Sequence, residues 1–151
     1  MKIRPVILCG GTGTRLWPNF KKHQAKQFID FGKWTLFGKT LSRIKSNIFD
    51  SPIISTNKEY LNLVKKHLKK AKISKYKIVL EPVKKNTAPA ILCAALIKEI
   101  PKEQALIFFS ADHLIKKISV FNKALYNNRH NLTDQNIFIF GIKPTYPSSE
   151  Y

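Results

Sequence analysis

The order of apolar runs and amphipathic stretches is the feature that most constrains how this 151-residue chain can fold. Short apolar runs, each typical of a buried strand, alternate with stretches in which apolar residues recur at helical spacing. Strands are expected at 5–9, 52–55, 77–80, 105–110 and 137–142, with a further brief strand at 27–31. Because strands that alternate with helices form right-handed βαβ units, the sequence predicts an α/β fold: a mostly parallel sheet with helices on both faces.

The four helices expected between the main strands differ in how much of their surface is apolar. Apolar residues recur at helical spacing in the first two, at Phe37, Leu41 and Ile44 and at Leu61, Val64, Leu68 and Ala71. In the third, Thr87 can act as the cap and residues 90–97 are apolar on nearly all sides, which predicts a buried helix. Ser119 can cap the fourth, which is expected to continue to about Asn131.

A formal net charge of +18, from 27 lysine and arginine residues against 9 acidic ones, raises the question of nucleic-acid binding. Ten lysines fall between Lys58 and Lys85, on an expected helix and its flanks. They have little aromatic interleaving and match no RNA- or DNA-binding motif, so a solvated lysine-rich face is favoured over a specific nucleic-acid site. The positive field also suits an anionic small substrate.

Neither a membrane span nor a secretory signal is predicted. The chain has no uninterrupted apolar run of about 18 residues or more, and Gly10 and Gly11 end the apolar N-terminal run too early for a signal peptide. A cytoplasmic location is therefore expected. Cys9 and Cys93 lack the spacing of metal ligands and are expected to be buried, reduced thiols.

The segment 8–28, LCGGTGTRLWPNFKKHQAKQF, joins the first expected strand to a basic, glycine-rich turn. Gly10, Gly11 and Gly13 lack a Cβ, so the backbone N–H groups around them can converge on an anion. The segment has neither the spacing of a Walker loop nor that of the dinucleotide-binding fingerprint. Its glycines alone are compatible with a phosphate-binding loop or with an ordinary tight turn.

Three features that follow expected strands are predicted to meet at one edge of the sheet: the glycine-rich turn, Glu81 with Pro82, and Asp112. Ligands of open parallel sheets bind beyond the carboxyl ends of the strands. Arg15 can grip phosphate oxygens with two nitrogens, and Lys26 adds a point charge. This edge is therefore expected to bind phosphate groups.

The segment 8–28 as a whole is a more specific signal of function than its glycines alone. GGTGTRLWP, followed by Lys26-Gln27-Phe28, resembles the signature of the sugar-1-phosphate nucleotidyltransferases, and the Trp17-Pro18 pair resembles their mannose-1-phosphate guanylyltransferase branch. Later stretches agree in order along essentially the full chain, at 81–82, 86–90, 110–113 and 141–151. The resemblance implies a Rossmann-like sheet of the nucleotide-diphospho-sugar transferase type.

The resemblance also implies an activity: formation of GDP-mannose and pyrophosphate from GTP and mannose 1-phosphate with Mg²⁺, for nucleotide-sugar and polysaccharide biosynthesis. Arg15 is then the candidate contact to the triphosphate and the leaving pyrophosphate, Lys26 the contact to the reacting phosphate, and Asp112 the ligand of Mg²⁺. The implied nucleotide-binding residues are Leu8, Gly10, Gly11, Thr12, Gly13, Thr14, Glu81, Asn86, Thr87 and Ala88.

Several of these side chains also have an ordinary structural interpretation. Glu81 could accept hydrogen bonds from the ring N–H and amino group of guanine, which adenine cannot match, or it could be a hydrated strand-end carboxylate. Asp112 could instead cap a helix or a turn. His113 is expected to be an ordinary hydrogen-bonded residue beside Asp112, and Trp17 and Trp34 are expected to be packing residues.

The chain departs from the resembled pattern at Phe20, Lys21, Ala25, Lys85 and Glu150, which replace serine, arginine, proline, arginine and glycine. Lysine lacks the two-nitrogen fork of arginine, so we expect a weaker grip on phosphate at Lys21 and Lys85.

Tyr151 ends the chain where the sugar-binding half begins in the resembled family. The 151 residues are therefore expected to be the N-terminal nucleotide-binding part of a truncated nucleotidyltransferase domain, without the sugar-binding half or a C-terminal domain. Uncovered apolar surface is then expected to favour aggregation. A homo-oligomer is expected only of the full-length form. The alternatives are a related transferase for another base or sugar, and an inactive basic nucleotide-binding fragment.

Overall fold

The computed structural model describes residues 2–11, 25–82 and 87–141. Its four strands form one sheet in the order β3-β2-β1-β4, and every neighbouring pair is parallel. The strands are β1 (Arg4–Leu8), β2 (Ile53–Thr56), β3 (Lys77–Leu80) and β4 (Leu106–Ser110). The parallel α/β sheet predicted from the apolar runs is therefore confirmed.

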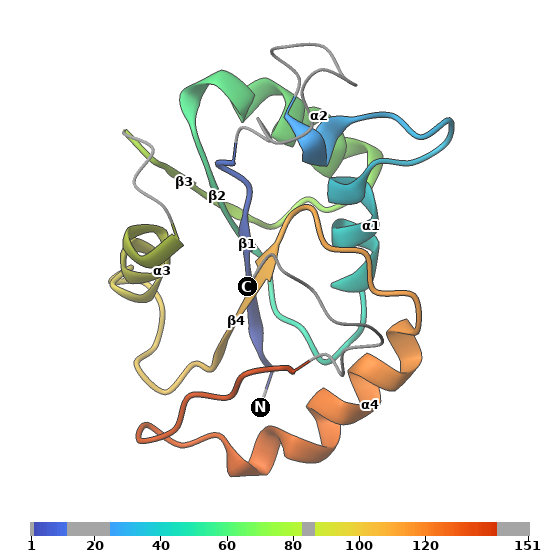
Figure 1. Cartoon of the computed structure of the whole chain (residues 1–151). Helices are drawn as coiled ribbons and strands as arrows, with labels where there is room; N and C mark the ends of the chain where they lie inside the picture. The colour runs from blue at the N-terminus through green and yellow to red at the C-terminus, as the bar shows by residue number, and fades with distance from the viewer. Residues whose placement is uncertain (1, 12–24, 83–86, 142–151) are drawn as a thin grey trace, which may run out of the picture.

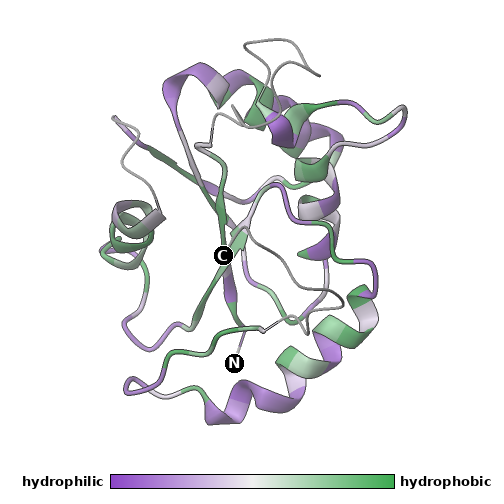
Figure 2. Ribbon diagram, in the orientation of Figure 1, coloured by the Kyte–Doolittle hydropathy of each residue, from purple (hydrophilic) through white to green (hydrophobic). Residues whose placement is uncertain are grey.

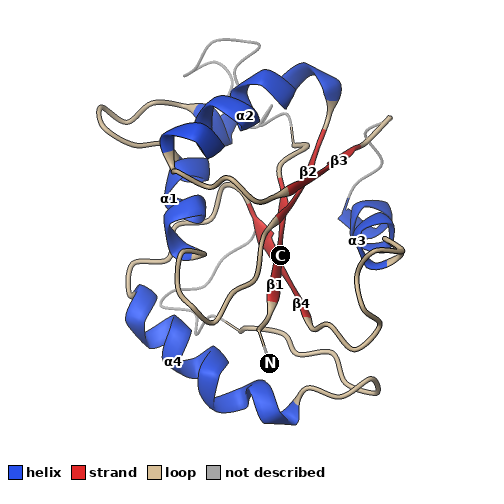
Figure 3. Ribbon diagram, turned by 180° about the vertical axis from the view of Figure 1, so that it is seen from behind, coloured by secondary structure: helices blue, strands red, loops and turns tan. Residues whose placement is uncertain are grey.

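Helices cover both faces of this sheet. Figures 1 and 3 show α3 alone on one face, with α1, α2 and α4 on the other. The α-helices are α1 (Leu36–Arg43), α2 (Leu61–Lys70), α3 (Thr87–Ala95) and α4 (Ile118–Asn128), and short 3-10 turns lie at η2 (Lys26–Phe28), η3 (Lys58–Tyr60) and η4 (Arg129–Asn131). No helix in these described ranges is long and apolar enough to cross a membrane.

The larger part of the hydrophobic core lies between the sheet and the three helices α1, α2 and α4. Ile7 and Ile54 contribute from the strands, and Leu41 and Val64 from the first two helices; all four are fully buried. A smaller cluster on the other face joins Val6 and Ile53 to helix α3. The strands accordingly stand out as hydrophobic segments, whereas α2 is largely hydrophilic on its outer side (Figure 2).

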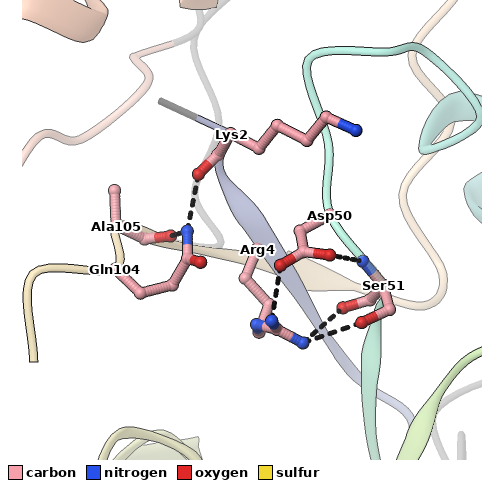
Figure 4. A network of polar contacts seen from close by, with 6 residues as sticks. All are labelled: Lys2, Arg4, Asp50, Ser51, Gln104 and Ala105. Atoms are coloured by element: carbon pink, nitrogen blue, oxygen red, sulfur yellow. Dashed lines mark hydrogen bonds and ion pairs between the residues drawn. The ribbon is translucent and has the colours of Figure 1, made fainter. Parts of the chain in front are cut away.

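The amino-terminal end of the sheet is fixed by polar contacts on both sides of β1 (Figure 4). The Arg4 guanidinium lies 2.5 Å from the Asp50 carboxylate and donates to the Ser51 hydroxyl at 2.8 Å. On the β4 side, the Gln104 amide donates to the carbonyl of Lys2 at 2.5 Å. These contacts hold the register of the strands at the end opposite to the predicted site.

The brief strand expected at 27–31 was wrong, because this stretch begins with the 3-10 turn η2. The N–H of Phe28 donates to the carbonyl of Ala25 at 3.0 Å, which closes the turn. Phe28 and Ile29 are buried although neither belongs to a strand. A short apolar stretch can thus be buried without pairing in a sheet.

The prediction of a buried helix at 90–97 was also wrong. In α3 only Ala90 and Ala94 are buried, whereas Leu92 is 58% exposed; Leu96, just after the helix, is 69% exposed. The small alanines allow the helix to lie close to the sheet, and no described residue covers its outer side. Cys93 lies on that exposed side, which corrects the expectation that both cysteines are buried.

Two expectations near the end of the chain were wrong as well. Ser119 lies inside α4, which follows Lys117 and has no side-chain cap. Residues 137–141 form no strand, and the side chains of Ile137 and Ile139 are largely exposed. An apolar run needs a neighbouring strand to become part of a sheet, and none pairs with these described residues.

Candidate active site

The hydrogen bonds between strands continue past the carboxyl ends of β1 and β4. The N–H of Cys9 donates to the carbonyl of Ser55 at 2.7 Å, and the N–H of Ala111 donates to the carbonyl of Leu8 at 3.1 Å. The loops that follow these strands therefore begin from fixed positions along one edge. This confirms that the start of the glycine-rich turn and the segment leading to Asp112 share an edge of the sheet.

Glu81, just after β3, lies directly against the glycine-rich turn. A Cβ on Gly10 would come within 3.0 Å of both carboxylate oxygens of Glu81. The hydroxyl of Ser55, fully buried in β2, donates to Oε1 of Glu81 at 2.7 Å. A buried hydroxyl therefore holds the Glu81 carboxylate, and the absence of a Cβ on Gly10 leaves room for this carboxylate.

Two side-chain amides hold the described part of the turn. The buried Gln27 amide donates to the carbonyls of Cys9 and Gly11, at 3.2 and 3.0 Å. The amide of Asn57 donates to the carbonyl of Gly10 at 3.4 Å. These residues and Ser55 were missed as contributors to the site, although Gln27 belongs to the motif and Asn57 directly follows a strand, which is a usable signal.

Lys26 and Asp112 meet at the same edge. The ammonium of Lys26 lies 3.6 Å from Oδ2 of Asp112, and both side chains remain partly open to solvent, at 39% and 33% exposure. The hydroxyl of Ser110 donates to Oδ1 of Asp112. Burial alone would raise the pKa of Asp112, but the Ser110 hydrogen bond and the charge of Lys26 outweigh it and lower this pKa overall.

The turn that carries Lys26 rests on an aromatic cluster. The ring of Phe28 packs edge-on against Phe37 and Tyr60, with ring centres 5.5 and 5.6 Å apart, and the His67 ring lies tilted against it at 5.5 Å. Aromatic rings at these separations attract one another through edge-to-face contacts. The backbone of Lys26 is therefore fixed by the core, while its ammonium stays accessible.

Residues 4–151 match the nucleotidyl transferase family. The chain belongs to this family. The matched range includes the glycine-rich turn, Lys26 and Asp112.

Curated proteins resemble the chain along nearly its whole length. It is 37% identical to a mannose-1-phosphate guanylyltransferase from Salmonella montevideo, over 99% of this chain and 32% of that protein. It is 35% identical to the alginate biosynthesis protein AlgA from Pseudomonas aeruginosa, over 97% of this chain and 31% of that protein. The chain spans about a third of the length of these curated relatives.

Solved structures agree with this fold. A structure described as mannose-6-phosphate isomerase from Helicobacter pylori superposes with a TM-score of 0.66 at 28% identity, covering 86% of this chain and 46% of that one. A structure described as a glucose-1-phosphate thymidylyltransferase from Bacillus anthracis gives a TM-score of 0.65 at 20% identity, covering 84% and 51%. The second similarity concerns the fold alone.

The remaining nucleotide-binding candidates divide into two groups. Leu8 ends β1, and Thr87 and Ala88 are the exposed first residues of α3. Thr12, Gly13, Thr14, Arg15 and Asn86 lie outside the described residues, as do Trp17, Phe20, Lys21, Lys85, Glu150 and Tyr151.

Two further expectations concern rings near the site. His113 is 73% exposed, with Nε2 4.0 Å from Oδ1 of Asp112, so it lies beside the aspartate as expected. Trp34 stacks on Phe31 with ring centres 4.8 Å apart, as a packing residue does.

The donors at this edge suit magnesium better than a softer metal. Within the described ranges, no three histidine, cysteine or acidic side chains gather as a ready-made metal site. Asp112 offers one partly exposed carboxylate. Magnesium commonly takes only one or two protein carboxylates together with substrate phosphates and waters, so a single aspartate fits it.

Proposed function

We propose that the chain is the nucleotide-binding part of a mannose-1-phosphate guanylyltransferase, an enzyme that forms GDP-mannose and pyrophosphate from GTP and mannose 1-phosphate. A cytoplasmic location and a role in polysaccharide biosynthesis belong to the same proposal. The observation that carries it is the 3.6 Å contact between Lys26 and Asp112 beside the glycine-rich turn. The similarity to curated guanylyltransferases over 99% of the chain supports the choice of reaction.

Lys26 and Asp112 have complementary tasks in this reaction. Before substrate arrives, each neutralises the other, because an ammonium at 3.6 Å favours the ionised carboxylate. A bound triphosphate offers Lys26 a more highly charged partner. Lys26 then contacts the reacting phosphate, where its charge stabilises the negative charge that develops during transfer, and Arg15 grips the departing pyrophosphate.

Asp112 is the residue that would hold Mg²⁺ in this proposal. A bound magnesium ion neutralises phosphate charge and orients the triphosphate for in-line attack. The Ser110 hydroxyl occupies part of Oδ1. The Asp112 carboxylate is ionised at neutral pH even with the ordinary aspartate pKa of about 3.9, and its lowered pKa extends this ionised state to lower pH. The oxygen that faces Lys26, Oδ2, retains lone pairs for a ligand.

Glu81 supports the choice of guanine. Its Oε1 accepts the Ser55 hydroxyl, which fixes the carboxylate in one orientation. A carboxylate has about four lone-pair sites, so it still has the capacity to accept the ring N–H and the amino group of guanine. Adenine has no such pair of adjacent donors, and its ring nitrogen would meet the carboxylate as a second acceptor.

The lysine-rich surface is assigned a supporting role. The lysines of α2, Lys65, Lys66, Lys69 and Lys70, are exposed. Such a surface attracts anions at long range and loses this effect as salt rises.

The rival function from another class is an inactive basic nucleotide-binding fragment. This rival predicts nucleotide binding without any preference among bases.

A nucleotide competition experiment tests the proposal. A fluorescent GTP analogue is bound to the 151-residue chain with Mg²⁺ and displaced by GTP, ATP, CTP, UTP or dTTP, with Glu81→Gln as the matched variant. The proposal expects GTP to displace the probe at about tenfold lower concentration than ATP, because a buried donor–acceptor mismatch costs about 1–3 kcal/mol. Equal displacement by all five nucleotides would contradict it. A preference for thymidine or cytidine nucleotides would instead indicate a transferase for another base.

A further inference from the structure

Arg43, the last residue of α1, is among the largest fully buried side chains in the described part of the molecule, with 2% of its surface exposed. A buried guanidinium is costly unless it is paired and hydrogen-bonded. Within the described residues no carboxylate forms an ion pair with Arg43, and its Nε has no hydrogen-bond partner. Burial accordingly lowers the pKa of its guanidinium.

The contacts that Arg43 does make lie on either side of Asp112. Its NH2 group donates to the carbonyl of His113 at 2.7 Å. Its guanidinium carbon lies 5.4 Å from the centre of the Phe109 ring, which belongs to β4. Arg43 thus spans the short segment 109–113, from the strand before Asp112 to the residue after it.

A contribution to stability does not explain an arginine in this position. An apolar side chain of similar volume would fill the same space without the cost of burying a charge. What an apolar residue could not supply is a charged donor to the His113 carbonyl. Hydrogen bonds from charged donors are shorter and stronger than neutral ones, and they fix the direction of the carbonyl that accepts them.

We propose that Arg43 is a positioning residue: by holding the His113 carbonyl, it fixes the turn after β4 so that the Asp112 carboxylate faces Lys26 and the bound metal. The part that concerns the metal rests on the proposed function. The orientation of the segment 109–113 does not depend on it. Residues that orient metal-ligating carboxylates from behind typically change metal affinity by about 10- to 100-fold when they are replaced.

Three variants separate positioning from packing. Arg43→Met keeps most of the buried volume and removes every donor, whereas Arg43→Lys keeps a charge and one donor group. Leu68→Ala is the matched control for lost core packing, because Leu68 is fully buried on α2 and is not a polar partner of the segment 109–113. Each variant is first checked by circular dichroism for the native helix and strand content.

Two measurements are made on each variant: amide hydrogen exchange of residues 109–115, and the Mg²⁺ concentration that gives half-maximal GTP binding. For Arg43→Met we expect exchange in this segment to rise at least about tenfold above that of Leu68→Ala. We also expect the half-saturating Mg²⁺ concentration to rise about tenfold, with Arg43→Lys restoring part of both. Leu68→Ala should exchange faster throughout the core while keeping its Mg²⁺ response.

Arg43→Met behaving like Leu68→Ala in both measurements would overturn the inference. The two proposals fail in different ways. A wild-type chain that binds GTP without regard to Mg²⁺ would contradict the proposed function, and the exchange data alone would then decide the role of Arg43. If Arg43→Met does not fold, the comparison of Arg43→Lys with the wild type gives the decision in the same two measurements.

Discussion

The ammonium of Lys26 lies 3.6 Å from Oδ2 of Asp112 and so joins the turn after the glycine-rich segment to the carboxyl end of β4. Both partners are partly exposed, and ion pairs of this kind contribute little to folding. The pKa of Asp112 is lowered overall, because the hydrogen bond from Ser110 and the charge of Lys26 outweigh the opposing effect of burial. The contact is therefore expected to matter for ligand binding more than for stability.

Replacement of Lys26 by methionine tests this separation. We expect Lys26→Met to change the free energy of unfolding by less than about 1 kcal/mol, because the pair is solvent-screened. We expect its GTP affinity to fall at least about tenfold, because a charge-assisted contact to phosphate is lost. Urea denaturation and calorimetric titration measure the two quantities. Lys45→Met, at an exposed lysine after α1, is the control, and an equal loss of affinity there would show that only the general positive field matters.

The contact between Gly10 and Glu81 predicts a non-additive pair of mutations. In Gly10→Ala the new Cβ would lie within 3.0 Å of both Glu81 oxygens, and the carboxylate cannot move aside freely because Ser55 holds it. We expect a loss of about 1–3 kcal/mol of stability, as in other overpacked sites. Gly11→Ala should be nearly neutral for folding, because a Cβ at Gly11 would meet no atom of the described residues within 4 Å.

A double-mutant cycle measures this coupling by urea denaturation. On a Glu81→Ala background, Gly10→Ala should cost clearly less than it does in the wild type. Identical costs on both backgrounds would mean that the side chain of Glu81 does not set the requirement for glycine at this position.

The buried hydroxyl of Ser55 is expected to control base preference without touching the nucleotide. Ser55→Ala removes the donor to Oε1 of Glu81, so the carboxylate can take other orientations. We expect the ratio of GTP to ATP affinity to fall several-fold, with a stability loss of about 1 kcal/mol. Thr40→Val is a useful control, because the Thr40 hydroxyl is buried without a hydrogen-bond partner among the described residues. It should leave base preference unchanged and slightly raise the melting temperature.

His67 predicts how stability depends on pH. Its ring packs against Phe28 and Phe37, and Nε2 lies 3.2 Å from the Thr35 hydroxyl. Burial, reinforced by Lys70 and Lys66, lowers the pKa of His67, so the folded chain takes up this proton less readily than the unfolded chain. Stability should therefore fall as the pH drops below the ordinary histidine value of about 6.5, and level off below the folded-state pKa.

The comparison of His67→Gln with the wild type, by urea denaturation between about pH 7.5 and about pH 5, tests this linkage. His67→Gln should lose less stability than the wild type over this range. A His67→Gln curve parallel to the wild-type curve would contradict the assignment.

The sheet and its order along the chain were predictable because each true strand is apolar and has a partner on at least one side. The run at 137–142 is just as apolar, and its sequence gives no sign that residues 137–141 lack a neighbouring strand with which to pair. The prediction for α3 failed for a related reason. Its leucines suggested that the helix is buried on nearly all sides, but only the side with Ala90 and Ala94 is buried against the sheet.

The candidate site was predictable for residues whose side-chain chemistry suits phosphate or metal and whose position in the sequence is recognisable. Lys26 belongs to a motif, and Glu81 and Asp112 follow strands. Ser55 and Arg43 could not be identified, because their importance comes from tertiary contacts. A serine inside an apolar strand resembles any buried hydroxyl, and an arginine in the last turn of a helix is ordinarily read as an exposed residue that complements the helix dipole. Only the contacts to Glu81 and to the His113 carbonyl show otherwise.

The most direct test of the proposed nucleotide site is calorimetric titration of GTP into the 151-residue chain, with and without Mg²⁺, for the wild type and for Asp112→Asn. Asparagine keeps the shape of the side chain and removes its charge. We predict saturable GTP binding that strengthens at least about tenfold with Mg²⁺ in the wild type, and that loses this Mg²⁺ dependence in Asp112→Asn. Equal Mg²⁺ dependence in both proteins would contradict the assignment of Asp112 to the metal and phosphate site.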